Sequence, residues 1–500
     1  MTGETVRRPA FPPMPHPVPI PSVRYRLPMR TARRYSFLIG WIPVFAAVAS
    51  AALVLRRELW FDEAITVSLY MMPLKLHQIY LSYVIPNNQI AYTVLLKLWN
   101  GMLPDTWPAN VAFWRILSLL AAVAAMVILY RLRSKLHDRT PWGAVTVLTA
   151  LAVSPAFQNY ATALRGYALS WFWIALSLDG AWRVFHGHAR SGWCLYAAGM
   201  LGAVGTVPTN LLACVGVVIY AFPWCGRDCL RDRRFLLLAA GPFLSIAVFY
   251  LPILHSFLNT FSLNEGFSGR FGALAVVYGS IAVTFGILPL VEIPRLKRRG
   301  LRRRFRCTIW FLPVPAILLL PNVPFPRVFC TLFPLYAMLL ADGIAAMGRV
   351  SRIRVAVSAG CLLVSLAALR LCAPAAASAS GLSEYEDDYF RPWYMAKDYS
   401  VRELLPELEK RPGVSTVFMS FASDPCPLMF YAALRSVKRD FLPDQPVGKV
   451  KTLPPSALFV LRRDESPEAF EARFGGKLLR LFTGHDCNVY LFAADAPPTE

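Results

Sequence analysis

The stretch Leu59-Trp60-Phe61-Asp62-Glu63-Ala64 follows the first long apolar segment of the chain and places two adjacent carboxylates at its end. An ionised Asp costs ~2.5 to 3.5 kcal/mol at the centre of a membrane helix, so we expect this pair to lie at a watery interface. Acids at such a position are functional by default. The alternative is that Asp62 and Glu63 only end the helix and solvate its last turn.

The composition around this stretch is that of a membrane protein. The 500 residues are 56% hydrophobic and 16% charged, with a mean hydropathy of +0.44. Apolar runs near the ~20 residues that cross a bilayer recur along the chain. Because backbone groups in lipid must be satisfied within the protein, the sequence predicts an all-α polytopic membrane bundle. The net charge of +22 does not indicate nucleic-acid binding, since the arginines cluster between apolar runs.

A basic, proline-rich tail at residues 1–35 precedes the first apolar segment at 36–55. The tail lacks the pattern of a cleavable signal peptide, and the positive-inside rule keeps it in the cytoplasm. Asp62 and Glu63 are therefore expected on the extracytoplasmic side of the inner (plasma) membrane, within a first outer loop at 56–111.

Residues 89–103 form a short apolar run that contains Lys97 and Trp99. If this run crossed the membrane, the basic loop at 131–139 and two later basic loops would lie outside. We therefore predict a juxtamembrane helix here. The other apolar runs give about eleven spanning helices within residues 36–375. After the first, they are expected near 112–130, 142–158, 168–185, 193–207, 209–224, 235–254, 271–291, 307–321, 328–347 and 355–373.

The odd number of spans places residues 383–500 outside, where the composition changes to that of a small α/β domain. Nothing in this segment resembles a catalytic signature, so we expect a lid or an acceptor-docking module. Its cysteines, Cys426 and Cys487, lie where a disulfide is permitted. Strands are expected at 414–421, 457–461 and 489–493, and helices at 401–410 and 466–475.

The predicted topology brings acids and cations to one outer surface. Arg165 and Arg327 lie at the outer ends of spans, against the positive-inside trend, which makes them candidates for binding an anion. The alternative is that each pairs with an acid or a lipid phosphate for stability. Three polar residues of the same surface, expected to share a pocket with Asp62, are Asn88, Gln89 and Tyr167.

Four motifs within residues 36–350 are Trp-Phe-Asp-Glu-Ala, Asn-Asn-Gln, Leu-Arg-Gly-Tyr-Ala-Leu and Pro-Arg-Val-Phe. They resemble motifs of the GT-C membrane glycosyltransferases, and most of all those of the bacterial relatives of protein O-mannosyltransferases and of the transferases that modify lipid A and lipopolysaccharide core. The resemblance implies a polyprenyl-phosphate sugar donor, a glycolipid or protein acceptor, and an active site at the outer face. It also implies that Asp62 is the catalytic base.

The chain departs from the pattern of that family in two places. Asn88-Gln89-Ile90 stands where family members usually have His-Pro-Pro or Asn-His-Pro, and Ala163 stands where many have Glu. A single Asp-Glu pair without further acids or His is a poor cage for a hard cation. The sequence therefore gives weak support for a divalent metal and assigns no metal ligand.

The chemistry of sugar transfer from a lipid phosphate needs one base for the acceptor hydroxyl and cations for the departing phosphate. We predict Asp62 as the base and Glu63 as an orienting or acceptor-binding group. Arg165 and Arg327 are predicted to clamp the donor phosphate through their planar guanidinium groups. A single-base mechanism inverts the anomeric carbon.

Two other functions stay open at this point. A transporter or flippase of a lipid-linked anion should carry polar groups at mid-membrane and paired broken helices. Asp179 and Asp342 lie toward predicted cytoplasmic ends instead, and no internal repeat is evident. A non-catalytic relative of the same fold is the third reading, because the acid expected at Ala163 is missing.

Overall fold

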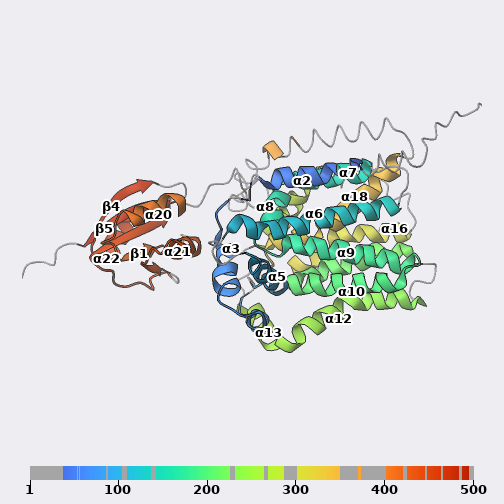
Figure 1. Cartoon of the computed structure of the whole chain (residues 1–500), viewed down its shortest axis with the longest axis horizontal. Helices are drawn as coiled ribbons and strands as arrows, with labels where there is room; N and C mark the ends of the chain where they lie inside the picture. Colours follow the sequence, from blue (N-terminus) through green and yellow to red (C-terminus); the bar gives the residue numbers. More distant parts are fainter. Residues whose placement is uncertain are drawn as a thin grey trace, which may run out of the picture.

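Figure 1 shows the computed structural model of the chain, a bundle of helices with a small mixed domain at one end. The structure describes residues 38–52, 54–55, 57–85, 88–103, 110–136, 142–225, 231–263, 269–286, 301–348, 367, 370–372, 401–420, 425–444, 447–462, 465–483 and 487–494. The predicted tail at 1–35 and most of the predicted span at 355–373 lie outside this description.

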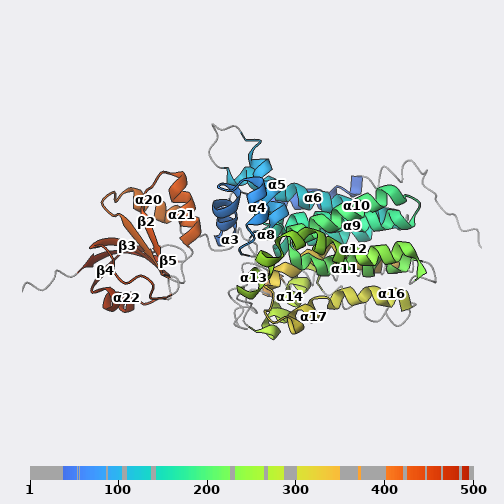
Figure 2. The same ribbon diagram turned by 90° about the horizontal axis from the view of Figure 1, so that it is seen from below.

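The centre of the bundle is built on α9 (Tyr167–Phe185), which packs between α6 (Val111–Leu136) and α10 (Ala189–Thr206). These helices run side by side in both views (Figures 1 and 2). A Cβ on Gly192 of α10 would lie 2.9 Å from the carbonyl oxygen of Gly180 on α9. Only glycine permits this approach, which is typical of helix packing within membranes.

The remaining elements of the bundle surround this centre. Helix α12 (Arg233–Tyr250) packs on α10, while α7 (Trp142–Ala152) packs on α2 (Ile42–Ala52) and on α18 (Phe333–Gly348). The other helical segments are α8 (Pro155–Thr162), η2 (Pro208–Asn210), α11 (Leu211–Ala221), η3 (Phe222–Trp224), η5 (Leu251–Ile253), α13 (Leu254–Leu263), α14 (Arg270–Phe285), α16 (Leu301–Arg306), η6 (Cys307–Phe311), α17 (Pro313–Leu319) and η7 (Pro326–Leu332).

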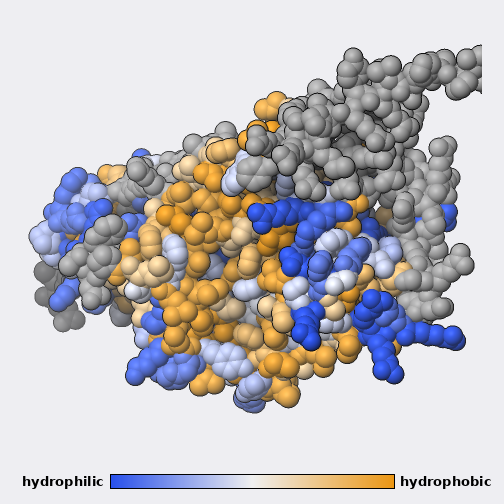
Figure 3. All heavy atoms as spheres, turned by 45° about the vertical axis from the view of Figure 1, so that its right-hand side comes forward, coloured by the Kyte–Doolittle hydropathy of each residue, from blue (hydrophilic) through white to orange (hydrophobic). Residues whose placement is uncertain are grey.

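Three helical runs within the described residues are long and apolar enough to cross a membrane: Val111–Leu136, Arg233–Thr260 and Pro326–Ile344. Shorter apolar helices include Ile42–Ala52 and Trp142–Ala152. Large apolar side chains are exposed on the flank of the bundle, as on α12 at Leu237, Phe243 and Val248. Figure 3 shows wide apolar areas over the bundle. The chain is therefore built as a membrane protein, while the count of about eleven spans stays a prediction.

The predicted span at 142–158 is not one continuous helix. Helix α7 ends at Ala152, and α8 begins at Pro155 after a break. The hydroxyl of Ser154 accepts a hydrogen bond from the amide of Phe157 at 3.1 Å, and proline is favoured at the first position of a helix. The hydropathy of the sequence does not reveal this break, because the residues on both sides of it are buried.

The segment after α2, which the sequence analysis predicts as an outer loop, forms short elements at the end of the bundle: α3 (Phe61–Ile65), η1 (Thr66–Met71), α4 (Leu76–Leu81) and α5 (Ile90–Asn100). At 1.5 Å per residue, the 11 residues of α5 reach about 16 Å, which is too short for a hydrocarbon core of ~30 Å. α5 packs against α4 and η1 and also contacts α10 and α6. Its short length agrees with the predicted juxtamembrane helix, while its position relative to a membrane stays a prediction.

The C-terminal domain contains a five-stranded sheet in the order β2-β1-β3-β5-β4. The strands β2, β1 and β3 are parallel, and β5 is antiparallel to both β3 and β4. The expected strands are present as β1 (Thr416–Met419), β3 (Ser456–Arg462) and β5 (Cys487–Ala494), and the expected helices as α20 (Val401–Glu409) and α22 (Pro467–Phe474). The elements that the sequence analysis did not predict are α21 (Pro425–Leu434), β2 (Asp440–Pro443) and β4 (Gly476–Thr483).

Each face of this sheet has its own core because side chains alternate along a strand. On β1, Val417 packs with α20 and α21, whereas Phe418 packs with the phenylalanines of α22 on the other face. Cys487 is buried on the first of these faces. Cys426 packs in a separate cluster that includes residues of the bundle. The disulfide between the two cysteines stays a prediction.

Candidate functional site

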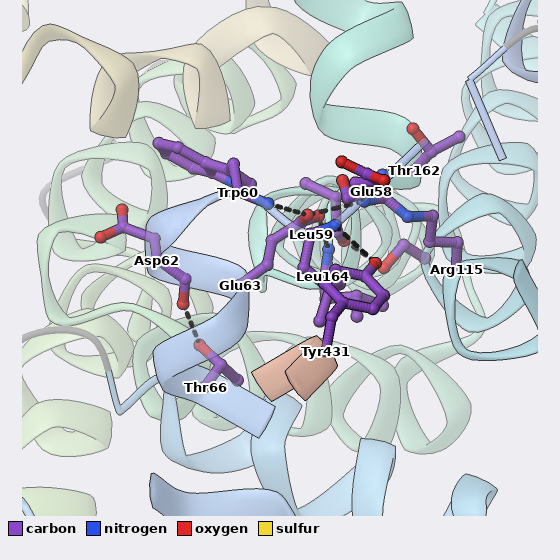
Figure 4. Close-up of polar contacts among 12 residues, drawn as sticks. Glu58, Leu59, Trp60, Asp62, Glu63, Thr66, Arg115, Thr162, Leu164 and Tyr431 are labelled. Carbon is purple, nitrogen blue, oxygen red and sulfur yellow. Dashed lines mark hydrogen bonds and ion pairs between the residues drawn. The ribbon is translucent and has the colours of Figure 1, made fainter. Parts of the chain in front are cut away.

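The two carboxylates of the Asp-Glu pair point in different directions from the short helix α3 (Figure 4). The chain enters α3 in an extended conformation at Trp60, so Asp62 and Glu63 lie in the first turn. The carboxylate of Glu63 accepts a hydrogen bond from the backbone amide of Trp60 at 3.2 Å, and this bond caps the N-terminus of α3. Acids in the first turn also favour the helix dipole.

Glu63 is fully buried and bonded to three separate segments. Its carboxylate lies 2.7 Å from Nη2 of Arg115, and both side chains are 0% exposed. It also accepts a hydrogen bond of 2.7 Å from the amide of Leu164, in the loop between α8 and α9. The same Nη2 of Arg115 donates to the carbonyl of Glu58 at 3.0 Å. Glu63 therefore ties α3, α6 and the 163–166 loop together.

Asp62 lies beside the two arginines that the sequence analysis selected. Its Oδ2 is 2.8 Å from Nη2 of Arg327 and 3.9 Å from Nη2 of Arg165. The Arg327 guanidinium lies over the rings of Trp60 and Phe325, at 5.2 Å and 4.8 Å from their centroids. The planar cation is thus held by two aromatic rings and a carboxylate.

Arg165 is positioned by the loop that links α8 to α9. Its Nη1 donates to the hydroxyl of Thr66 at 3.3 Å, and that hydroxyl donates to the carbonyl of Asp62 at 2.9 Å. The next amide, that of Gly166, donates to the side-chain oxygen of Gln89. A Cβ on Gly166 would collide with the methyl group of Thr206, so only glycine fits here.

The other two residues predicted for the pocket have distinct places. The hydroxyl of Tyr167 lies within electrostatic range of Arg327, Arg165 and Asp62. The side-chain amide of Asn88 donates to the carbonyls of Ile79 and Ser82, at 2.8 and 3.0 Å. Asn88 thus provides hydrogen-bond donors for the backbone carbonyls at the C-terminal end of α4. The structure brings Gln89 and Tyr167 to the Arg165 loop, while a pocket shared by all of them stays a prediction.

The C-terminal domain touches this site through α21. The hydroxyl of Tyr431 accepts a hydrogen bond from the amide of Leu59 at 3.0 Å. The neighbouring Phe430 packs on Trp114, with 6.3 Å between the ring centroids, in one buried cluster with Leu59 and Leu164. In Figures 1 and 2 α21 lies on the side of the domain that faces α3.

Sequence reasoning missed Arg115, Thr66 and Tyr431. A signal existed for Arg115, because an arginine inside an apolar helix is costly unless it has a partner. No comparable signal marks Thr66 or Tyr431, whose importance depends on which backbone group each one contacts.

The arrangement can do two things chemically. Asp62 is a carboxylate that can take a proton, and it is adjacent to two fixed cations. Asp62 and its two arginines together carry one net positive charge, which favours an anion such as a phosphate. No group of three or more His, Cys, Asp or Glu side chains gathers anywhere in the described part of the chain.

Comparisons with known proteins identify the fold. The chain is similar to ArnT from Cupriavidus metallidurans, a GT-C glycosyltransferase, over 92% of this chain and 98% of that one, with a TM-score of 0.56 and 15% identity. It is also similar to the Archaeoglobus fulgidus oligosaccharyltransferase in complex with Zn and sulfate, over 92% and 74% of the two chains, with a TM-score of 0.44 and 14% identity. No protein-family profile and no curated protein matches the chain. The chain has the GT-C fold that its motifs predicted.

Proposed function

We propose that this protein is a membrane glycosyltransferase that moves a sugar from a polyprenyl phosphate to a hydroxyl group of a glycolipid or a protein. The observation that supports it best is the convergence of one carboxylate and two guanidinium groups, from three distant segments, at one end of an apolar bundle. The ArnT-like fold supports the same class of reaction.

In the proposed reaction Asp62 accepts the proton of the attacking hydroxyl. The acceptor oxygen forms a bond to the anomeric carbon while the bond from that carbon to the phosphate oxygen breaks. The electron pair of that bond leaves with the phosphate, and Arg327 and Arg165 stabilise the charge that develops on it. Attack from the face opposite the leaving phosphate inverts the anomeric carbon.

Arg327 is the better placed of the two proposed phosphate clamps. Its side chain is 18% exposed, compared with 4% for Arg165, and it bonds Asp62 directly. A donor phosphate that binds Arg327 would release part of the Asp62 carboxylate from its ion pair. Binding of the donor would therefore make Asp62 a stronger base, because a close cation lowers the proton affinity of a carboxylate.

Glu63 is proposed as a positioning residue. The sequence left open whether it orients other groups or binds the acceptor. Complete burial and three bonded partners favour the orienting role, since an acceptor would have to displace Arg115 to reach it.

We place the site at the outer face of the inner membrane, with the N-terminus in the cytoplasm and the C-terminal domain in the periplasm. The excess of cations in the loops of the other side supports this orientation. The donor would then reach the site from the outer leaflet.

The test is sugar transfer by the purified protein, alone in proteoliposomes, from a radiolabelled polyprenyl-phosphate sugar to lipid A or to a hydroxyl-bearing peptide. A glycosyltransferase gives a labelled product whose anomeric configuration is opposite to that of the donor. Movement of the intact donor between leaflets without any product would instead identify a flippase. Neither product nor movement, with donor binding retained, would identify a non-catalytic relative.

A further inference from the structure

The contact between α21 and the segment before α3 joins the C-terminal domain to the bundle next to the site. We name the four residues of this contact, Tyr431 and Phe430 with Leu59 and Trp114, the α21 latch. Leu59 is fully buried, so its amide has no access to water and depends on the hydroxyl of Tyr431.

The α21 latch is connected to the Asp-Glu pair through Arg115. Trp114 precedes Arg115 on α6, and Arg115 bonds both Glu63 and the carbonyl of Glu58, the residue before Leu59. The segment from Leu59 to Glu63 is therefore held from two sides, by Tyr431 at its start and by Arg115 at both ends. A shift of α21 would move Leu59 and, with it, the first turn that presents Asp62.

We infer that Tyr431, a residue of the C-terminal domain, is a positioning residue for Asp62 and that the α21 latch sets the rate of the chemical step. This inference rests on the proposed glycosyltransferase function. Tyr431 acts through Leu59 and Glu63 and does not touch the donor phosphate. Burial raises the pKa of its phenol to about 12, so the hydroxyl stays protonated and its oxygen stays an uncharged acceptor at neutral pH.

The geometry predicts different effects on kcat and on the KM for the donor. The donor phosphate is bound by Arg165 and Arg327, which lie on other segments of the chain. Loss of the α21 latch should therefore lower kcat and change the KM for the donor much less, because Arg327, the more exposed of the two proposed clamps, lies on η7, outside the segments that Glu63 ties together.

The experiment compares Tyr431→Phe with Tyr490→Phe in the full-length protein. Tyr490 lies in β5, paired with Phe459 and Arg480 within the sheet, so its variant removes a hydroxyl from the same domain without touching α3. We expect Tyr431→Phe to lower kcat by about tenfold, with a donor KM within about twofold of the wild type. Tyr490→Phe should change neither.

Amide hydrogen exchange provides a readout that does not depend on activity. In Tyr431→Phe the amide of Leu59 should exchange faster, and so should those of Trp60 and Leu164, which both donate to Glu63. If only Leu59 changes, or if none does, the α21 latch does not reach Glu63 and the inference is wrong. Faster exchange at all three amides with unchanged kcat would also overturn it, by making Tyr431 purely structural.

Failure of the proposed function has a different signature. A wild-type protein that transfers no sugar under any condition contradicts the glycosyltransferase, whatever the exchange data show. In that case faster exchange at Leu59, Trp60 and Leu164 in Tyr431→Phe still supports the α21 latch as the support of this segment, and unchanged exchange still rejects it.

Discussion

Each end of the bundle carries an aspartate between two arginines, and the two ends differ in how fully that aspartate is bonded. At the end away from the C-terminal domain, Asp342 lies 2.9 Å from Arg133 and 3.1 Å from Arg306, and Tyr220 donates to it at 2.8 Å. Arg306 also stacks over Tyr220, 4.2 Å from its ring centroid. At the other end Asp62 has one arginine at 2.8 Å and the second at 3.9 Å.

A structural ion pair and a reactive one differ in how fully the carboxylate is bonded to its cations. Asp342 uses its charge to link α6, α16 and α18, as Glu63 links α3 to α6. Asp62 instead lies beside a second cation that is close enough to attract an anion without being in full contact with the carboxylate. We expect substitutions at the two ends to have opposite effects on folding and on turnover.

The largest effect is expected from Asp62→Asn compared with Asp342→Asn. Asparagine keeps the size of Asp62 but cannot take the acceptor proton, so turnover should fall by about 10² to 10⁴-fold while the folded protein persists. Asp342→Asn should lower the midpoint of thermal unfolding and leave turnover per folded molecule nearly normal. Turnover of the labelled donor and thermal unfolding in detergent measure both. Near-normal turnover by Asp62→Asn would remove Asp62 as the base.

The next effect concerns one arginine at each end of the bundle, Arg115 and Arg306. Arg115→Ala leaves Glu63 buried without its cation and should lower the free energy of unfolding by about 3 to 5 kcal/mol. Arg306→Ala should cost less, because Asp342 keeps Arg133 and lies at 14% exposure. Thermal unfolding of both variants in the same detergent decides the order. Equal losses would mean that the two ends are structurally equivalent.

A smaller effect is expected at the proposed phosphate clamp. Arg327→Ala should weaken use of the donor by about 1.5 to 3 kcal/mol, seen as a higher KM or a lower kcat/KM. Arg327→Lys keeps the charge but loses the planar stacking on Trp60 and Phe325, so it should recover part of that loss. If Arg327→Ala fails to fold and its folded fraction turns over normally, the arginine belongs to a structural ion pair instead.

The smallest effect is expected at a third aspartate, Asp444 of the C-terminal domain. It forms an ion pair that takes no part in the proposed reaction, so it serves as a reference. Arg473 bonds both oxygens of Asp444 at 2.6 and 3.0 Å, and this bidentate contact lowers the pKa of the carboxyl to about 2. Because the folded pKa lies below the unfolded value of about 3.9, the contribution is complete above about pH 5 and is lost as the pH falls toward 2.

This contribution is about 2 kcal/mol at neutral pH. The amides of Gly448 and Val450 donate to Asp444 and report on it directly. Their exchange, corrected for the intrinsic effect of pH, should accelerate between pH 4 and pH 2 in the wild type and should be insensitive to pH in Asp444→Asn. Equal pH dependence in both proteins would assign the loss to another group.

The apolar helices and three of the five strands could be predicted from the sequence because hydropathy and alternation are local properties. The convergence of Asp62 with Arg165 and Arg327 followed from topology, since outer ends of spanning helices share one surface. The partner of Glu63 could not be predicted, because nothing local pairs Glu63 with Arg115 across 52 residues.

Other features depended on tertiary contacts that no local pattern encodes. The edge strand β2 has only four residues and follows a basic segment, so its sequence lacks clear alternation. The contact of Tyr431 with Leu59 depends on how the C-terminal domain is placed on the bundle, and it joins residues 372 positions apart.

Because of that separation, Leu59 is translated long before the residue that hydrogen-bonds its amide. Translation makes Leu59 and Glu63 early, yet the hydroxyl that satisfies Leu59 belongs to a residue made after every apolar helix in the described structure. A ribosome-bound chain that has inserted its helices thus still lacks the final support of α3. The proposed active site would then reach its working geometry only once the C-terminal domain has folded against the bundle.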